Sequence, residues 1–326
     1  MICVSIFDQS GTTHRPGPVV YGDHVVAARE RSAPIVALET TIVSHGLPRP
    51  ENLDVAREVE QVVRDNGAVP ATIGMIGGQV VVGVDDKQLT RLATADPVAK
   101  LSVRDLAVAA AGGVDGATTV AGTSAIAAAA GIRVFATGGL GGVHREAGYD
   151  ESADLVTLAR TPIAVVCAGV KSILDVGATL ERLETLGVAV IGYRTRRFPG
   201  FFISDSGYPV DWVVDSPQEI AAVLRTQADQ GVHTGAVVVA NPLPPDEQVE
   251  PALHDRVLTE GMATLAGEGV TGKAVTPALL AYFHAATQGR SLVANVRIIL
   301  RNAALAAQIA VALSAGEGSG RSEELT

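Results

Sequence analysis

The chain has 326 residues, of which 47% are hydrophobic, and a formal net charge of −10. A chain of this length can bury one large core or two modest ones. Its acidity disfavours general affinity for nucleic acids, so an anionic substrate must be held by a local cluster of donors. We therefore expect no nucleic-acid partner and favour a small phosphate ester as substrate.

The sequence also indicates a cytoplasmic protein that does not interact with membranes. It contains two cysteines, Cys3 and Cys167, which do not indicate a disulfide framework. The start, MICVSIFDQSG, has no basic leader. The longest uncharged stretch, between Asp115 and Arg133, is too weakly apolar to span a bilayer.

Short β-branched runs alternate with longer helical patterns along most of the chain. This alternation predicts an α/β protein, with a layered α/β/α fold and a mixed central sheet flanked by helices. We expect a single domain over residues 21–314, between a flexible extension (1–20) and a disordered tail (315–326). The clearest strands are Ile35 to Leu38, Ala71 to Ile76, Val80 to Val84, Val134 to Ala136, Ile163 to Cys167, Val188 to Ile191 and Ala236 to Ala240.

One amphipathic helix is expected to begin near Pro50 and to stop at Gly67. Its charged residues fall on the side opposite to an apolar stripe. The stripe consists of Leu53, Ala56, Val59, Val62 and Val63.

Two of the expected strands lead directly to a charged side chain. Glu39 follows the apolar run that ends at Leu38, and Lys171 lies just beyond the strand that ends at Cys167. Open α/β sheets bind ligands at the carboxyl ends of their strands. Desolvation there favours a neutral, nucleophilic lysine and a protonated carboxyl group that can act as a general acid. A solvent-reaching lysine in the first turn of a helix and a capping or ion-paired glutamate are the plainer alternatives.

Eight segments carry a family resemblance, and they occur in the family's order from about Pro34 to about Ala312. They are ALETTIVSHGLPRPEN, VPATIGMIGG, GATTVAGT, VFATGGLGGVHRE, SADL, VVCAGVKSILD, IGYRTRRFPGFF and VVVANPLP. Together they resemble the pseudouridine-5'-phosphate glycosidase family. Several of these motifs are long and unusual in composition, and they cover nearly the whole chain.

The resemblance implies catalytic roles for Lys171 and Glu39. Lys171 matches the family's lysine that attacks C1' of the ribose, and Glu39 matches the proton donor that opens the sugar ring. Lys100, in the K-x-S-x-R-D-L context, matches a substrate-binding lysine at the sugar phosphate or beside Lys171. From the residues alone, a solvated surface charge before a helix is the favoured interpretation of Lys100.

Several further positions match the family's substrate site. The Gly-rich loop over residues 137–144 can bring backbone N–H groups close to a ligand, although tight turns use the same residues. Threonine and asparagine caps explain other matches equally well. The substrate-binding residues implied are Thr119, Val120, Gly139, His144, Ser152, Ala153, Asp154 and Asn295. Further candidates to contact base or sugar are Asn241, Tyr193, Arg194, Phe201 and Phe202.

Asp150 and Asp154 form an i, i+4 pair of carboxylates, which repel one another on a helix face unless a cation or substrate compensates. Two solvated acids are the plainer alternative. The resemblance implies that Asp150 binds one divalent metal per subunit, with Mn²⁺ first and Mg²⁺ second, because hard oxygen ligands suit both. The segment HREAGYDESAD is two residues shorter than the family pattern and has Glu151 in place of isoleucine. Glu151 is therefore an alternative or additional ligand.

The activity implied is reversible cleavage of the C–C glycosidic bond of pseudouridine 5'-phosphate, giving uracil and ribose 5-phosphate through a lysine Schiff base. The resemblance also implies a homotrimer and no organic cofactor. Two alternatives stay open. One is a different Schiff-base lyase or aldolase acting on a phosphosugar, and the other is a sugar-phosphate-binding homologue that has lost activity.

Overall fold

The computed structural model describes residues 19–145, 150–270 and 275–320, and the side chains up to residue 316. Within these ranges, eleven strands form one sheet in the order β1-β4-β3-β2-β7-β9-β13-β11-β12, with β6 paired to β3 and β5 paired to β6. The strands are β1 Val20–Tyr21, β2 Ile35–Leu38, β3 Val69–Ile76, β4 Gln79–Val82, β5 Ala99–Leu101, β6 Gly116–Thr118, β7 Val134–Ala136, β9 Ala164–Cys167, β11 Ala189–Tyr193, β12 Trp212–Val214 and β13 Val237–Ala240. A separate antiparallel pair joins β8 Val143–His144 to β10 Leu174–Asp175.

The sheet is mixed, as predicted. β2, β7, β9, β13 and β11 are parallel neighbours, whereas β3 runs antiparallel to β4 and β6. Each strand expected from the sequence is present, with its ends within two residues of the expected ones. The central strands are apolar throughout because both of their faces are covered.

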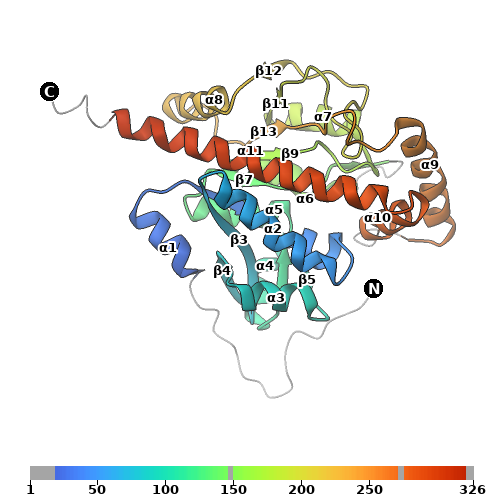
Figure 1. The fold of residues 1–326 in the computed structure, drawn as a ribbon, viewed down its shortest axis with the longest axis horizontal. Coiled ribbons are helices and arrows are strands. Elements are labelled where there is room, and N and C mark those ends of the chain that lie inside the picture. The colour runs from blue at the N-terminus through green and yellow to red at the C-terminus, as the bar shows by residue number, and fades with distance from the viewer. Residues whose placement is uncertain (1–18, 146–149, 271–274, 321–326) are drawn as a thin grey trace.

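Helices cover the two faces of the sheet, which confirms the layered α/β/α fold (Figure 1). One core layer is formed with α2, α8 and α11, and the other with α1, α5, α6 and α7. Along β9, Ala164 and Val166 face the first layer, while Val165 and Cys167 face the second. The helices are α1 Asp23–Glu30, α2 Glu51–Asp65, α3 Asp86–Thr94, α4 Leu106–Ala111, α5 Val120–Ala129, α6 Ala153–Leu158, α7 Val176–Thr185, α8 Pro217–Gln230, α9 Pro251–Gly267, α10 Val275–Ala286 and α11 Arg290–Gly320.

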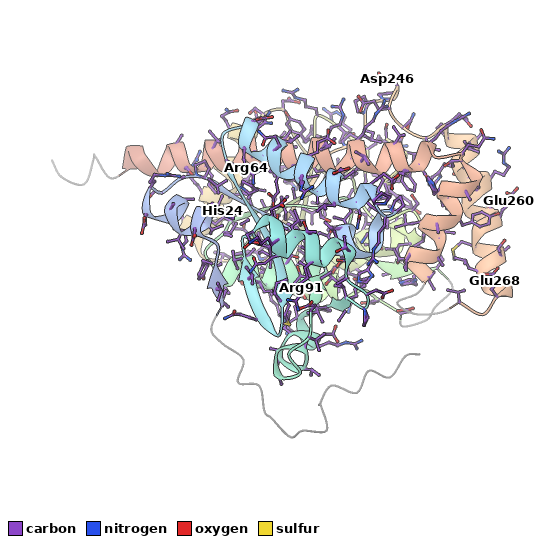
Figure 2. All side chains as sticks on the ribbon, turned by 60° about the horizontal axis from the view of Figure 1, so that its bottom comes forward. His24, Arg64, Arg91, Asp246, Glu260 and Glu268 are labelled. Carbon is purple, nitrogen blue, oxygen red and sulfur yellow. The ribbon has the colours of Figure 1, made fainter. Side chains whose placement is uncertain are left out.

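The amphipathic helix expected from Pro50 is α2, and its apolar stripe packs on the sheet. The chain leaves this helix through Gly67, whose φ of +85° lies in the left-handed region that glycine adopts without strain. Most charged side chains lie on the outside of the molecule, and Figure 2 shows Asp246, Glu260 and Glu268 at its rim.

The long helix α11 crosses the molecule over the sheet (Figure 1). By length and composition its segment from Arg290 to Gly316 could cross a membrane. In the fold this segment packs on α2, α8 and the central strands, and 56% of its most apolar window is buried. That packing accounts for its apolar sequence. The helix continues to Gly320, past the boundary at residue 315 expected for the tail, while residues 1–18 and 321–326 lie outside the described ranges.

Four adjacent parallel strands, β2, β7, β9 and β13, end at the same edge of the sheet. Glu39 follows β2, Thr137 follows β7, and Asn241 follows β13, while Lys171 lies four residues beyond the end of β9. Helices α9 and α10 pack beyond this edge, in a third core cluster. The fold therefore brings these polar residues to one place.

Candidate active site

A cavity of about 380 Å³ lies at this edge of the sheet. It contains both residues expected to be catalytic and most of those expected to bind substrate. The lining comprises Glu39, Thr41, Lys100, Ser102, Arg104, Thr119, Val120, Gly141, Gly142, His144, Asp150, Glu151, Ser152, Ala153, Asp154, Lys171, Leu174 and Thr276.

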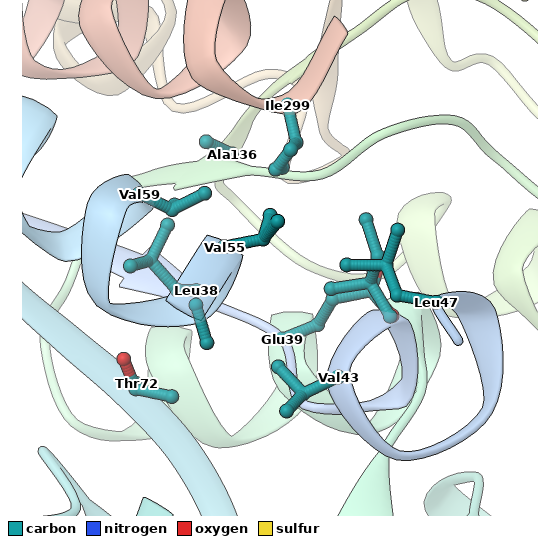
Figure 3. A pocket seen from close by; sticks show the side chains of 11 residues that line it. Leu38, Glu39, Val43, Leu47, Val55, Val59, Thr72, Ala136 and Ile299 are labelled. Carbon is teal, nitrogen blue, oxygen red and sulfur yellow. The ribbon is translucent and has the colours of Figure 1, made fainter. Parts of the chain in front are cut away.

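The Glu39 side chain is almost fully buried, with 6% of its surface exposed. It accepts a hydrogen bond from the hydroxyl of Thr137. On its other side is a small apolar cavity formed by residues such as Leu38, Val43 and Val59 (Figure 3). Burial raises the pKa of Glu39, and the charge of Lys171 and the Thr137 hydrogen bond oppose this only in part. The raised pKa favours the protonated form of a carboxyl group that lines the main cavity.

The backbone after Glu39 is fixed by a buried set of threonines. Thr40 Oγ1 donates to the carbonyl of Ile73 in β3 at 2.8 Å, and it accepts from the backbone N–H of Thr118 at 2.9 Å. Thr41 Oγ1 donates to the Thr118 carbonyl at 2.8 Å. The next residues, Ile42–Gly46, form a π-helix, a conformation that occurs often at functional sites. Strands β3 and β6 thus hold the segment that carries the acid.

Lys171 lies in a partly buried turn between β9 and β10. Its backbone N–H donates to the Leu140 carbonyl at 3.1 Å, and its carbonyl accepts from the N–H of Leu174 at 2.9 Å. The expectation that Lys171 occupies the first turn of a helix is wrong, because the next helix, α7, begins only at Val176. A helix dipole therefore does not act on Lys171. Lys171 still lines the same cavity as Glu39.

Lys100 lies inside β5, paired in register with Ala117 of β6, and is partly buried. The plainer expectation of a solvated surface charge is therefore wrong. Lys100, Lys171 and Glu39 line the same two cavities, and both lysines lower the pKa of Glu39 electrostatically. The cavity can hold an anionic ligand although the whole chain is acidic.

The Asp154 carboxylate connects three segments of the cavity wall. It is 5% exposed and accepts from the backbone N–H of Ala121 at 2.9 Å and from that of Gly141 at 2.8 Å. Asp154 is in the first turn of α6, whereas Asp150 precedes that helix, so the two do not form a pair on one helix face. The interpretation of Asp154 as a solvated acid is wrong as well.

The cap interpretations of Thr119 and Ser152 hold, and both residues still line the cavity. Thr119 caps α5 and accepts from the N–H of Gly122 at 3.3 Å. Ser152 caps α6 and accepts from the N–H of Asp154 at 3.2 Å. Two helix N-termini therefore face the ligand space, where their partial positive charge favours an anion.

A smaller, more apolar cavity of about 40 Å³ adjoins the main one and shares Glu39, Lys100 and Lys171 with it. Gly139 and Asn295 line this second cavity. Asn295 is 5% exposed, and its Oδ1 has no hydrogen-bond partner among the described residues. The aromatic ring of Phe201 forms part of the wall beside Gly139, where an added Cβ would approach it to 2.6 Å.

Three of the four expected base-contacting candidates from GYRTRRFPGFF do not line either of these cavities. Phe202 packs against Phe201 and Phe283 in the core, and Arg194 stacks on Tyr193. Asn241 does not line either cavity, and its Nδ2 donates to the Oδ1 of Asn302 at 2.9 Å. Among these candidates, Phe201 alone faces the site.

Comparisons with known proteins identify the family to which this chain is similar. The family described as Indigoidine synthase A like protein matches residues 24–312. A pseudouridine-5'-phosphate glycosidase from Salinispora tropica is 73% identical over 90% of this chain and 92% of its own. A protein of the same name from Streptomyces griseus is 57% identical over 88% of this chain and 90% of its own.

The chain belongs to the pseudouridine-5'-phosphate glycosidase family. Two solved structures share its fold. The prealnumycin C-glycosynthase AlnA, solved in complex with ribulose 5-phosphate, aligns with a TM-score of 0.85 and 37% identity over 93% of this chain and 100% of its own. An indigoidine synthase A-like protein from Thermotoga maritima aligns with a TM-score of 0.81 and 33% identity over 91% of this chain and 97% of its own.

The family resemblance implies a metal at Asp150, and the donors around it fit only a largely hydrated ion. Asp150 is exposed on the cavity wall. The neighbouring Glu151 carboxylate is bound by Arg182, whose Nε donates to it at 2.9 Å. In the described part of the chain, no three His, Cys, Asp or Glu side chains converge on a common point. A single hard carboxylate with water ligands suits Mg²⁺ or Mn²⁺.

Sequence reasoning missed several residues of this family member's site. Thr41, Ser102, Arg104 and Thr276 line the main cavity, and Asn302 in α11 contacts the loop after β7. The ETT motif next to Glu39 was a usable signal for Thr41. Thr276 and Asn302 come from helices far along the chain, and their sequence neighbourhood does not distinguish them from helix residues elsewhere.

Proposed function

We infer that this protein catalyses the reversible cleavage of pseudouridine 5'-phosphate to uracil and ribose 5-phosphate, as glycosidases of its family do. The observation that carries this inference is that the buried Glu39, whose pKa is raised by burial, and Lys171 line one cavity. The 73% identity to a pseudouridine-5'-phosphate glycosidase supports the same substrate. An inactive homologue is a poorer explanation, because a buried carboxyl group and a lysine in one cavity are the pair of groups that Schiff-base chemistry needs.

The first step joins the lysine to the sugar. The Nζ of Lys171 attacks C1' of the ribose, and the bond between C1' and the ring oxygen breaks. Glu39 gives its proton to that oxygen, which becomes the O4' hydroxyl of an open chain. Ring opening comes first because C1' of a C-nucleoside carries no good leaving group other than the ring oxygen.

The second step breaks the C–C bond. The ammonium formed at Nζ first gives one proton back to the Glu39 carboxylate. The nitrogen lone pair of Lys171 then forms the C1'=N bond as uracil departs with the electron pair of the C–C bond, and C5 takes up that proton. Water hydrolyses the resulting protonated imine, which releases ribose 5-phosphate and restores the lysine amine and the Glu39 carboxyl group. The net reaction consumes one water, and we propose no organic cofactor because the lysine nitrogen supplies the electron pair that expels uracil.

The cavity walls offer binding groups for each part of the substrate. Lys100 and the N-termini of α5 and α6 provide positive potential for the sugar phosphate and hydroxyls. The smaller cavity, with the unpaired Oδ1 of Asn295 and the ring of Phe201, suits a flat base that carries N–H donors. The proposed substrate-binding residues are Lys100, Thr119, Val120, Gly139, His144, Ser152, Ala153, Asp154 and Asn295.

We propose that Asp150 holds one divalent ion per subunit, with Mn²⁺ preferred. When bound, the ion would supply positive charge and ordered water to the cavity that Asp150 lines. The family resemblance alone suggests a homotrimer. Light scattering coupled to size-exclusion chromatography tests that assembly directly.

Trapping of the imine tests the proposed function. The protein is incubated with ribose 5-phosphate, reduced with borohydride and digested, and the adduct is located by peptide mass mapping. We expect the sugar on Lys171, with the exposed Lys87 of α3 unmodified as an internal control for nonspecific glycation. In parallel, chromatography should show uracil formed from pseudouridine 5'-phosphate. An adduct on Lys100 instead would reverse the assigned roles of the two lysines.

A further inference from the structure

A buried chain of hydrogen bonds links the C-terminal helix to the proposed acid. Asn241, at the end of β13, donates from Nδ2 to the Oδ1 of Asn302 in α11 at 2.9 Å. Asn302 Nδ2 donates to the carbonyl of Thr137 at 2.7 Å and approaches that of Gly138 at 3.4 Å. The hydroxyl of Thr137 in turn donates to Glu39. Hydrogen bonds thus link residues from four segments distant in sequence, and the last of these residues is Glu39.

Asn302 is an unusual residue for its place in the fold. It is 0% exposed, and the same helix contributes Ile299, Ala303 and Ala306 to the apolar core around it. An amide buried among such residues costs free energy unless both of its ends form hydrogen bonds. Both ends of the Asn302 amide do so, and they are directed at the ends of β7 and β13 rather than at the helix itself. A generic apolar helix contact would not require an amide here.

Thr137 is the residue on which this chain of hydrogen bonds acts. Its backbone N–H continues the β7–β9 ladder by donating to Val166, and its carbonyl is held by Asn302. With both backbone groups fixed, the direction of the Cα–Cβ bond is fixed, and the hydroxyl carried by that Cβ donates to Glu39. A rotation of the Thr137 peptide would move the hydroxyl away from the carboxyl group.

We propose that Asn302 is a positioning residue for the proton donor, acting on Glu39 through Thr137 and itself held by Asn241. The proposal rests on the proposed function, because it takes Glu39 to be the acid. Asn302 does not touch the substrate cavities. Its contribution is to fix the direction in which Glu39 presents its proton, and small displacements of a reacting group are costly in rate.

The proposal has a consequence for the pH dependence of the reaction. The Thr137 hydrogen bond lowers the pKa of Glu39, against the larger effect of burial. The other charged groups that act on Glu39 are Lys171 and Lys100, which also lower its pKa, and Asp154, which raises it. Loosening Thr137 removes one of the lowering contributions. The pKa of Glu39 then rises further, and the alkaline limb of kcat, where the acid loses its proton, moves to higher pH.

The test compares Asn302→Ala with Gln308→Ala across a range of pH. Gln308 provides the matched control, since its Nε2 also connects α11 to another element, at 3.0 Å from Asn66 Oδ1, but on the exposed side. For Asn302→Ala we expect kcat to fall by roughly ten- to a hundredfold with a nearly unchanged KM, as for a displaced reacting group. The alkaline limb should move upward. Gln308→Ala should keep the wild-type kcat and limb.

Three outcomes would overturn the proposal: a wild-type kcat and pH profile in Asn302→Ala, a kcat loss that only matches the unfolded fraction, or a loss with an unmoved alkaline limb. If Asn302→Ala does not fold, Asn241→Ala replaces it, because Asn241 is only partly buried and removal of its amide leaves Asn302 without its anchor. The same direction of shift is expected, and its absence counts against the proposal. Failure of the wild-type protein to release uracil would instead refute the proposed function.

Discussion

Two carboxyl groups of the same cavity differ in almost every physical respect. Glu39 is nearly fully buried, receives a hydrogen bond from Thr137, and adjoins a small apolar cavity. Asp150 is exposed on the cavity wall, next to Glu151, whose carboxylate is bound by Arg182. Burial raises the pKa of Glu39, which favours the protonated form that can donate. Asp150 lies in water, where a carboxylate can share a hydrated cation.

The comparison shows that environment, rather than residue type, assigns the two roles. Desolvation favours the neutral form of an acid, whereas exposure leaves the charged form available to a metal. The sheet edge enforces this difference: the acid comes directly from a central strand, and Asp150 comes from a connection outside the sheet. Changes that remove or exchange these environments test the comparison.

The largest effect is expected for Glu39→Gln. Glutamine keeps the shape and can accept the Thr137 hydrogen bond, but it has no proton to donate. We expect turnover of pseudouridine 5'-phosphate to fall by roughly two to four orders of magnitude, while substrate binding stays nearly intact. Steady-state kinetics together with a binding titration measure both quantities. Near wild-type turnover with weak binding would show that Glu39 is a binding group.

The same variant should change stability in a pH-dependent way. The folded state holds the Glu39 proton at pH values where the unfolded chain releases it, because burial raises the pKa in the fold. Stability is therefore lost as the pH rises from the ordinary glutamate pKa towards the raised one. Glu39→Gln removes this loss, so its Tm should exceed that of the wild type at pH 7.5, with a smaller difference at pH 5. A pH-independent difference would contradict the raised pKa.

Asp150→Ala should have the next largest effect. If a hydrated ion depends on this single carboxylate, its removal should abolish activation by added Mn²⁺ and lower activity at least about tenfold, in line with the 10- to 100-fold cost of weaker perturbations at metal sites. Activity is measured after chelation and after titration with Mn²⁺. A variant that Mn²⁺ still activates fully would place the ion elsewhere.

A smaller effect is expected from the apolar wall behind Glu39. Val59→Thr places a hydroxyl in the cavity that Glu39 adjoins (Figure 3). The added dipole offsets part of the desolvation, so the pKa of Glu39 should fall and the alkaline limb of kcat should move down by up to about one pH unit, the equivalent of one net hydrogen bond. Val62→Thr, on the same helix but outside this cavity, is the control. Equal pH profiles for the two variants would show that the apolar wall at Val59 does not affect the pKa of Glu39.

Much of the fold could be predicted from periodicity. Strand runs such as the one before Glu39 are apolar because both faces of a parallel strand are covered, and this signal is local in the sequence. The helix expected after Cys167 was wrong for a physical reason. The segment around Lys171 is short and apolar, and its conformation is set by pairing with Leu140 and His144, which lie about 30 residues earlier in the chain.

The site was predictable where a motif adjoins a strand end, as at Glu39, and less so where tertiary contacts decide. Asp154 resembles a surface acid in the sequence, yet it is buried and accepts backbone N–H groups from the first turn of α5 and from the loop after β7. Asn302 is one of several polar residues in the long helix α11, and its partners directly follow β7 and β13. Hydrogen bonds between distant segments produce no periodic pattern in the sequence from which they could be predicted.

Glu151→Ala should give the smallest effect and decides between the two neighbouring acids. The Glu151 carboxylate is bound by Arg182 at 2.9 Å, and the two side chains are about one third exposed. Such a pair contributes about 0–1 kcal/mol to stability, so its loss should be mild. We expect Mn²⁺ activation to remain. Turnover should change by less than about twofold, which corresponds to less than about 0.5 kcal/mol in the activation free energy. Arg182→Ala is the matched control, because it breaks the same ion pair but leaves the carboxylate in place. If Glu151→Ala abolishes metal activation while Arg182→Ala and Asp150→Ala do not, the shortened loop has moved metal binding by one residue. Glu151, rather than Asp150, is then the exposed carboxylate to be compared with Glu39.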